Sequence, residues 1–165
     1  MTRAFVTLVA SDHVAPGALV LAHRLRDLHD GRKPLPRLAC IVSTDVTPDT
    51  RHALATSFDD VIQVHPPRSK AVMNLHLIGK PDTAASLTKI ELWRLEQYDK
   101  VVYLDPDVFP LRSIDELFDL DELSAAPEIG WPDWFNTCVF VATPDEETYT
   151  ELKEMTEQDR LYDGK

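Results

Sequence analysis

The sequence of 165 residues predicts an α/β fold, in which helices cover a parallel sheet. Three short apolar segments typical of buried strands, at residues 4–9, 38–42 and 61–64, alternate with two segments of helical periodicity. Strands that alternate with helices in this way are typical of parallel sheets with helical crossovers. The length suits one domain with a single core.

The two helices between these strands carry recognisable start signals. Pro16 suits the first position of a helix and Gly31 its C-cap, and Thr47-Pro48 starts the second helix. The apolar residues of the first helix recur at helical spacing: Ala18, Leu21, Ala22, Leu25 and Leu28.

The second half continues the pattern after an irregular stretch. Residues 68–81 have no clean period and are expected to form a loop or lid, whereas residues 82–98 have helical spacing. Residues 101–104 form an apolar run that predicts a central strand. The remaining expected elements are a short helix capped by the box Ser113–Glu116, strands at 124–127 and 138–142, and a final helix capped by the box Thr143–Glu146. No closing element follows, so we expect a fold that is incomplete at its C-terminal end.

The composition excludes several classes of protein. The net charge is −11 and no basic stretch is present, which argues against nucleic-acid binding. No segment is long and apolar enough to span a membrane, and the N-terminus lacks a secretory signal, so we expect a cytoplasmic protein. Cys40 and Cys138 lie in apolar strand-like runs without metal-binding spacing and are expected to be free thiols.

The segment most informative about chemistry is the Asp-Pro-Asp triplet that directly follows the strand at 101–104. Ligands of open α/β sheets bind beyond the carboxyl ends of strands. Pro106 favours an extended Asp105, and side chains at i and i+2 of an extended chain share a face, so Asp105 and Asp107 should point the same way. A hard cation such as Mn²⁺ or Mg²⁺ would offset their repulsion and bridge them to a phosphate. The alternative is a simple turn after a strand.

Two further features have a functional and a plain interpretation. Lys89, on the helix before the triplet, could reach the same pocket or lie in solvent. The aromatic run 131–136 could form a wall that contacts a sugar, with Asn136 as a hydroxyl ligand, or it could be a packed turn.

The order of seven short motifs resembles that of the glycogenin-type glycosyltransferases over almost the whole chain. The matching motifs are Phe5–Leu8, Gly17–Leu21, Leu87–Lys89 with Trp93, Leu104–Asp107, Asp115–Phe118, Ser124–Pro127 and Gly130–Asp133 with Phe135-Asn136. The resemblance implies a Rossmann-like nucleotide-sugar glycosyltransferase fold with a mixed, mainly parallel sheet. Residues 1–165 would be the N-terminal, nucleotide-sugar-binding part of a longer domain.

The resemblance also implies a role for each matching position. Asp105 and Asp107 match metal ligands with Pro106 between them in the nucleotide-contacting triplet. Lys89 matches a lysine that approaches the diphosphate and the sugar, and Asp163 an aspartate close to the transferred glucose; these two are the catalytic candidates. The remaining substrate-binding positions are Leu8, Ala10, Ser11 and Val14 for the uridine, Lys80 for the nucleotide, and Asn136 and Thr137 for the sugar.

The implied activity is the retaining, Mn²⁺-dependent transfer of glucose from UDP-glucose to a protein tyrosine or a growing glucan, as in the priming of glycogen synthesis. Implied partners of the complete protein are glycogen synthase and a second copy in a homodimer. The chain departs from the family at Val14, Ser11, Pro106 and Thr137-Cys138, and it stops at Lys165, before the family's third metal ligand and its acceptor tyrosine. The alternatives are an inactive UDP-sugar-binding or interaction module and a related hexosyltransferase with another acceptor.

Overall fold

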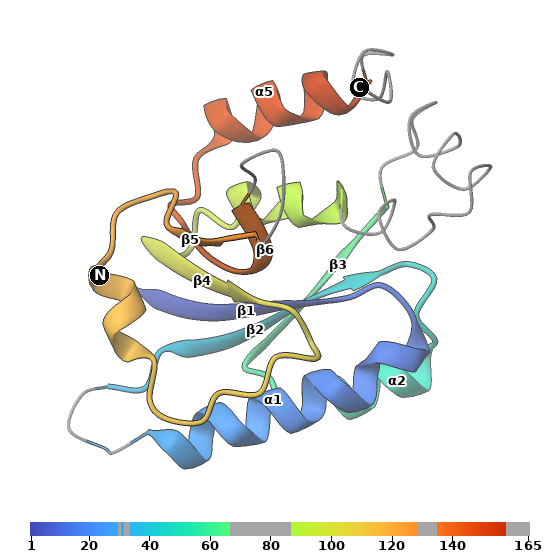
Figure 1. The fold of residues 1–165 in the computed structure, drawn as a ribbon. Helices are drawn as coiled ribbons and strands as arrows, with labels where there is room; N and C mark the ends of the chain where they lie inside the picture. Colours follow the sequence, from blue (N-terminus) through green and yellow to red (C-terminus); the bar gives the residue numbers. More distant parts are fainter. Residues whose placement is uncertain (30, 32–33, 67–86, 129–134, 158–165) are drawn as a thin grey trace.

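The computed structural model describes residues 1–29, 31, 34–66, 87–128 and 135–157, and this part of the chain forms a six-stranded sheet with helices on both faces (Figure 1). The strands are β1 (Arg3–Val9), β2 (Arg37–Ser43), β3 (Asp60–Val64), β4 (Lys100–Leu104), β5 (Ala125–Pro127) and β6 (Phe135–Ala142). The α-helices are α1 (Ala15–Leu28), α2 (Pro48–Ala55) and α5 (Glu146–Glu157), and the 3-10 helices are η1 (Asp12–Val14), η2 (Leu87–Arg94) and η3 (Asp115–Asp119).

The sheet is mixed and mainly parallel, as predicted. Its strand order is β3-β2-β1-β4-β6-β5. β1 pairs in parallel with both β2 and β4, and β2 pairs in parallel with β3, whereas β6 runs antiparallel to β4 and β5. The chain leaves β1 towards β2 and β3 and returns to β4 on the opposite side of β1. The order of the strands therefore reverses between β1 and β4.

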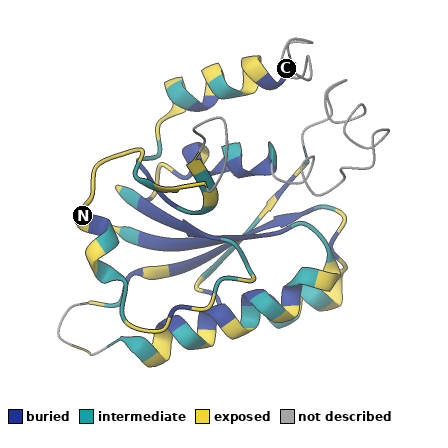
Figure 2. Cartoon of the chain, viewed as in Figure 1, coloured by how far each residue is buried: buried dark blue, intermediate teal, exposed yellow. Residues whose placement is uncertain are grey.

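Two hydrophobic layers hold the helices against the sheet, and the alternation of side chains along the strands separates them. Phe5 and Val9 of β1 face the layer shared with α1 and α2, whereas Val6 and Leu8 face the layer shared with η2 and α5. Figure 2 shows the resulting distribution, with the buried residues concentrated along the sheet and on the sheet-facing side of the helices. No helix in the described ranges is long and apolar enough to cross a membrane.

The prediction of a long helix over residues 82–98 is wrong for its described part, residues 87–98, in both the type and the length of the helix. Only residues 87–94 are helical, and they form the 3-10 helix η2. The carbonyl oxygen of Trp93 accepts a hydrogen bond from the backbone amide of Asp145, at 2.9 Å, so a partner distant in the sequence takes the acceptor that a continuing helix would use. Residues 82–86, like the predicted loop at 68–81, lie outside the described residues.

Three predicted caps also differ from the structure. α1 begins at Ala15 and its C-cap is His29, so Gly31, whose φ is 73°, lies beyond the cap. η3 has Ile114 as N-cap, and the hydroxyl of Ser113 accepts instead from the amide of Asp115. At α5 the Asp145 carboxylate, not Thr143, caps the helix by accepting from the amide of Thr148 at 2.7 Å. The cap predicted at Thr47 is confirmed.

Candidate functional site

The predicted site lies at the carboxyl ends of β1 and β4, where the strand order reverses. The segment from Ala10 to Val14 follows β1, and the triplet from Asp105 to Asp107 follows β4, the parallel neighbour of β1. In open α/β sheets this switch point is where a crevice for ligands forms. The amino end of β6 lies at the same edge, because β6 runs antiparallel to β4 and the amide of Asp105 donates to the carbonyl of Cys138 at 2.8 Å.

The backbone after β4 forms a turn and does not continue in extended conformation. The amide of Val108 donates to the carbonyl of Asp105 at 3.0 Å, which closes a four-residue turn with Pro106 at its second position. The expectation that Asp105 and Asp107 lie along an extended segment is therefore wrong. Proline is favoured at this turn position because its fixed φ matches the turn.

The two carboxylates nevertheless act on the same neighbours. Burial raises the pKa of Tyr103, and the negative charges of Asp105 and Asp107 raise it further. Burial and the Asp105 carboxylate likewise raise the pKa of the Cys138 thiol. The charge of Asp107 adds to this increase, whereas the Lys89 ammonium lowers the pKa. A negative potential from both aspartates therefore covers one small region.

Lys89 lies in this region and not in solvent. Its ammonium is 2.8 Å from Oδ1 and 3.1 Å from Oδ2 of Asp105, and it donates to the backbone carbonyl of Thr137 at 3.1 Å. The Lys89 side chain is 11% exposed and that of Asp105 is 20% exposed, so the ion pair is largely withdrawn from water. The ammonium also lies 4.9 Å from the centre of the Tyr103 ring. Lys89 of the 3-10 helix η2 thus places a buried positive charge at the carboxyl end of β4. This position agrees with the functional interpretation of Lys89 and not with a lysine in solvent.

The predicted sugar-contacting positions border the same charges. Asn136 is half-buried; its amide donates to Glu128 at 2.7 Å and its side-chain oxygen accepts from the amide of Cys138 at 2.7 Å. Thr137 is exposed, and its hydroxyl lies 3.3 Å from the Lys89 ammonium. Both residues therefore lie at the amino end of β6, where the backbone of Thr137 contacts Lys89.

Helix α1 approaches the triplet closely through Gly17. A Cβ at Gly17 would lie 2.5 Å from the carbonyl oxygen of Pro106, which is closer than atoms in van der Waals contact. The absence of a side chain thus lets the first turn of α1 rest against the Asp-Pro-Asp turn. Sequence reasoning noticed Gly17 only as part of a motif and did not foresee this contact.

The positions predicted to hold the uridine lie at the carboxyl end of β1, the strand next to β4. Ala10, Ser11 and Val14 are half-buried, and Leu8 is buried in the layer facing η2. This segment is fixed by Asp12, whose carboxylate accepts from the amide of Thr47 at 3.0 Å. The side chain of Leu8 is thus part of the core, whereas the other three residues are partly exposed.

The oxygen donors fit a hard divalent cation only in part. Asp105 and Asp107 supply carboxylates, the ligand type that Mn²⁺ and Mg²⁺ prefer, and such ions commonly add phosphate and water oxygens to one or two carboxylates. Among the described residues no group of three or more His, Cys, Asp or Glu side chains could hold a metal. Further ligands would have to come from a substrate, from water or from other parts of the chain. Lys80 and Asp163, and Trp131 and Trp134 of the aromatic run, lie outside the described residues.

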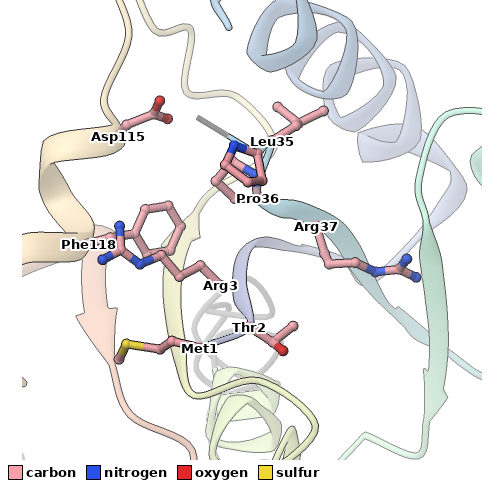
Figure 3. Close-up of a pocket in the computed structure, with 9 residues that line it drawn as sticks. Met1, Thr2, Arg3, Leu35, Pro36, Arg37, Asp115 and Phe118 are labelled. Atoms are coloured by element: carbon pink, nitrogen blue, oxygen red, sulfur yellow. The ribbon is translucent and has the colours of Figure 1, made fainter. Parts of the chain in front are cut away.

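A cavity of about 510 Å³ lies away from these residues, among side chains of the amino ends of β1 and β2 (Figure 3). It is lined by Met1, Thr2, Arg3, Pro34, Leu35, Pro36, Arg37, Asp115 and Phe118. The guanidinium groups of its two arginines are already paired, Arg3 with Asp119 and Arg37 with Asp60. The chemistry-bearing residues belong to the opposite edge of the sheet, and we place the site there.

Tyr103 and Cys138 also neighbour Asp105 in the candidate site, and sequence reasoning did not include them. The hydroxyl of Tyr103 donates to Oδ1 of Asp105 at 2.5 Å. The signal available in the sequence was the spacing of two between Tyr103 and Asp105, which places both on one face of a strand. The position of Cys138 depends on the pairing of β6 with β4, which no local pattern indicates.

Solved structures with the same mixed, mainly parallel sheet place this chain in the class of proteins with a glycosyltransferase fold. The galactosyltransferase LgtC in complex with donor and acceptor sugar analogs has the same fold, with a TM-score of 0.65 and 20% identity over 94% of this chain and 66% of that one. The glycosyltransferase GlyE of Streptococcus pneumoniae aligns with a TM-score of 0.63 and 18% identity over 99% of this chain and 41% of that one.

The sequence assigns the family. Residues 5–128 match glycosyl transferase family 8, and the chain belongs to this family. Glycogenin-1 of Caenorhabditis elegans is 44% identical over 99% of this chain and 37% of its own length, and glycogenin-1 of Homo sapiens is 42% identical over 98% and 45%. The chain thus spans less than half the length of these two curated relatives, and the resemblance to glycogenin seen in the sequence motifs is confirmed.

Proposed function

We propose that this chain is the nucleotide-sugar-binding part of a glucosyltransferase that moves glucose from UDP-glucose to a protein tyrosine or a growing glucan, with retention of configuration. Identity of 42–44% to proteins named glycogenin-1 supports the choice of sugar and acceptor. The single structural observation that carries the proposal is the Lys89–Asp105 pair at the switch point, with an ammonium–carboxylate distance of 2.8 Å.

The positive and negative side chains of the site would bind different parts of the ligand. A diphosphate is an anion, and this chain is acidic with a net charge of −11, so local positive charge has to attract the ligand. The Lys89 ammonium would donate to the diphosphate, and its partial burial strengthens that interaction because little water screens it. Asp105 and Asp107 would hold a divalent cation, with Mn²⁺ proposed and Mg²⁺ as the alternative, which would supply Lewis-acid stabilisation of the leaving group when bound.

The other predicted positions would orient the substrate. The segment that would lie along the nucleoside comprises Leu8, Ala10, Ser11 and Val14. Asn136 and Thr137 would contact the sugar hydroxyls. Lys80 and Asp163 keep their proposed roles beside the nucleotide and the transferred glucose, and Pro106 its place between the metal ligands. For the complete protein we also propose a cytoplasmic homodimer that acts with glycogen synthase.

Calorimetric titration of UDP-glucose, with and without Mn²⁺, tests the proposal on the full-length protein. We expect binding that requires Mn²⁺ and disappears in Asp105→Ala and Asp107→Ala, together with transfer of labelled glucose to the protein. Mn²⁺-dependent binding without any transfer would identify a UDP-sugar-binding module instead. Wild-type affinity and turnover in Asp107→Ala would overturn the assignment of the metal ligands.

A further inference from the structure

The ring of Tyr103 is held rigidly beneath the proposed metal site. Tyr103 is completely buried, and its ring packs against that of Phe140 with centroids 5.0 Å apart. It lies two residues before Asp105, at the carboxyl end of β4. A buried aromatic ring on a central strand has little freedom to move, so the direction of its hydroxyl is fixed by the sheet.

The two oxygens of the Asp105 carboxylate have unequal partners. Oδ1 accepts from the Tyr103 hydroxyl at 2.5 Å and lies 2.8 Å from the Lys89 ammonium, whereas the contact of Oδ2 with that ammonium is longer, at 3.1 Å. A carboxylate oxygen has about two lone-pair sites, so Oδ1 is fully engaged. Burial and the Asp105 carboxylate also raise the pKa of the nearby Cys138 thiol, but a thiol is a weak donor that would not hold a carboxylate oxygen against a cation. Among the described contacts, Oδ2 is therefore the oxygen available to a further ligand.

We propose that Tyr103 is a positioning residue whose hydroxyl fixes the Asp105 carboxylate so that Oδ2 is the oxygen presented to the divalent cation. This inference rests on the proposed function, because it deepens the role of the same site. Tyr103 acts through Asp105 and does not itself contact the cation. Hydrogen-bond partners that orient a metal ligand typically change metal affinity by 10- to 100-fold.

The Tyr103→Phe variant isolates the hydroxyl. It keeps the ring, its packing on Phe140 and the contact of the ring with the Lys89 ammonium, 4.9 Å from its centre. Only the donor to Asp105 is lost, and the Lys89 ammonium, which contacts both carboxylate oxygens, no longer has a partner that distinguishes Oδ1 from Oδ2.

Tyr98→Phe provides a matched control in the same protein. Tyr98 is also buried, and its hydroxyl donates to Oδ2 of Asp60 at 2.5 Å. Asp60 begins β3 and so lies at the amino edge of the sheet, opposite the proposed site. The control removes the same kind of tyrosine–aspartate hydrogen bond without touching the acidic triplet.

The experiment is a titration of the full-length protein with Mn²⁺, in which electron paramagnetic resonance measures the free ion, and thermal unfolding of the metal-free protein measures folding. We expect Tyr103→Phe to weaken Mn²⁺ binding roughly 10- to 100-fold and Tyr98→Phe to leave it within about twofold. Replacement of Tyr103 by 4-aminophenylalanine, which restores an N–H donor at the same point, should recover most of the affinity. This rescue distinguishes a lost hydrogen bond from general damage even if Tyr103→Phe is poorly folded.

The remaining outcomes separate the two proposals. If the wild-type protein binds Mn²⁺ and Tyr103→Phe binds it as tightly as Tyr98→Phe does, the role of Tyr103 is overturned and the metal site stands. Failure of 4-aminophenylalanine to recover a lost affinity would also overturn that role. If the wild-type protein binds no Mn²⁺, the metal site itself is overturned, and the role of Tyr103 with it.

Discussion

Lys89 and Asp105 are 16 positions apart in the sequence and form an ion pair. The Lys89 ammonium contacts both carboxylate oxygens, Oδ1 at 2.8 Å and Oδ2 at 3.1 Å. The pair connects the 3-10 helix η2 to the carboxyl end of β4. Because both side chains are mostly buried, it serves at once as a fold contact and as a positive charge beside the acidic triplet. Loss of the ammonium should therefore affect both stability and ligand binding.

Lys89→Met removes the charge and keeps most of the apolar stem. The Asp105 carboxylate then loses its counter-ion, and we expect a loss of roughly 2–3 kcal/mol in the free energy of unfolding, between the values for exposed and fully buried pairs. A charge-assisted hydrogen bond contributes about 1.5–3 kcal/mol, so UDP-glucose affinity should fall roughly 10- to 100-fold. Urea unfolding and calorimetry measure the two effects.

Lys100→Met is the control for this substitution. Lys100 begins β4 at the opposite edge of the sheet, and its ammonium donates to the carbonyl of Leu120 at 2.7 Å. We expect its affinity for UDP-glucose to equal that of the wild type. Equal losses of affinity in both variants would show that the effect is one of overall charge and not of the site.

Gly17→Ala should disturb the site through the backbone of the triplet. The new Cβ would lie 2.5 Å from the carbonyl oxygen of Pro106, and since this neighbour is backbone, either α1 or the turn must shift. Overpacking of this kind costs about 1–3 kcal/mol. We expect lower stability and at least a tenfold loss of Mn²⁺-dependent UDP-glucose affinity.

Gly31→Ala separates loss of stability from loss of the site. Gly31 has a φ of 73°, and a Cβ there would have open space around it to 4 Å, so alanine is strained by about 1–2 kcal/mol without a clash. This variant should be destabilised and bind UDP-glucose normally. If Gly17→Ala also bound normally, the contact between α1 and the triplet would have no role in binding.

The sequence predicts the elements whose signals are local and misses what depends on distant partners. The apolar runs of β1, β2, β3 and β4 and the cap at Thr47 are predicted because each is encoded within a few residues. The helix type and the end of η2 are not predicted. The carbonyl of Trp93 accepts a hydrogen bond from the amide of Asp145, which lies far along the chain, after β6.

The same distinction applies to the site. The acidic triplet is visible as a motif, and its place at the end of a strand is confirmed. The pairing of Lys89 with Asp105 and the approach of Gly17 to Pro106 require the packing of η2 and α1 against the sheet, which periodicity does not specify. The resemblance to a family indicated that these positions matter, but it did not predict that they contact one another.

The lowered pKa of Asp60 should make the free energy of unfolding depend on pH. Burial raises its pKa, but the hydrogen bond from Tyr98 and the ion pair with Arg37 outweigh burial and hold the pKa below the usual value. A carboxyl group with a lowered pKa contributes stability that is present above its unfolded pKa, about 4, and is lost as the pH falls through its folded pKa. Asp60→Asn should therefore be destabilised by about 1–2 kcal/mol at pH 7, with a smaller difference at pH 3. Urea unfolding at both pH values tests this, and a difference that grew towards pH 3 would contradict it.

The two cysteines should react at different rates with iodoacetamide. Burial raises the pKa of Cys40 to about 12, so at pH 8 only about one molecule in 10⁴ carries the reactive thiolate, and the side chain is fully enclosed. Cys138 has a raised pKa as well, but it is only half-buried beside Lys89 and Asp105. We expect mass spectrometry of the native protein to find Cys138 alkylated well before Cys40, and UDP-glucose with Mn²⁺ to slow the reaction at Cys138 alone. In urea both thiols should react equally fast; faster labelling of Cys40 in the native protein would contradict the burial of β2 in the core.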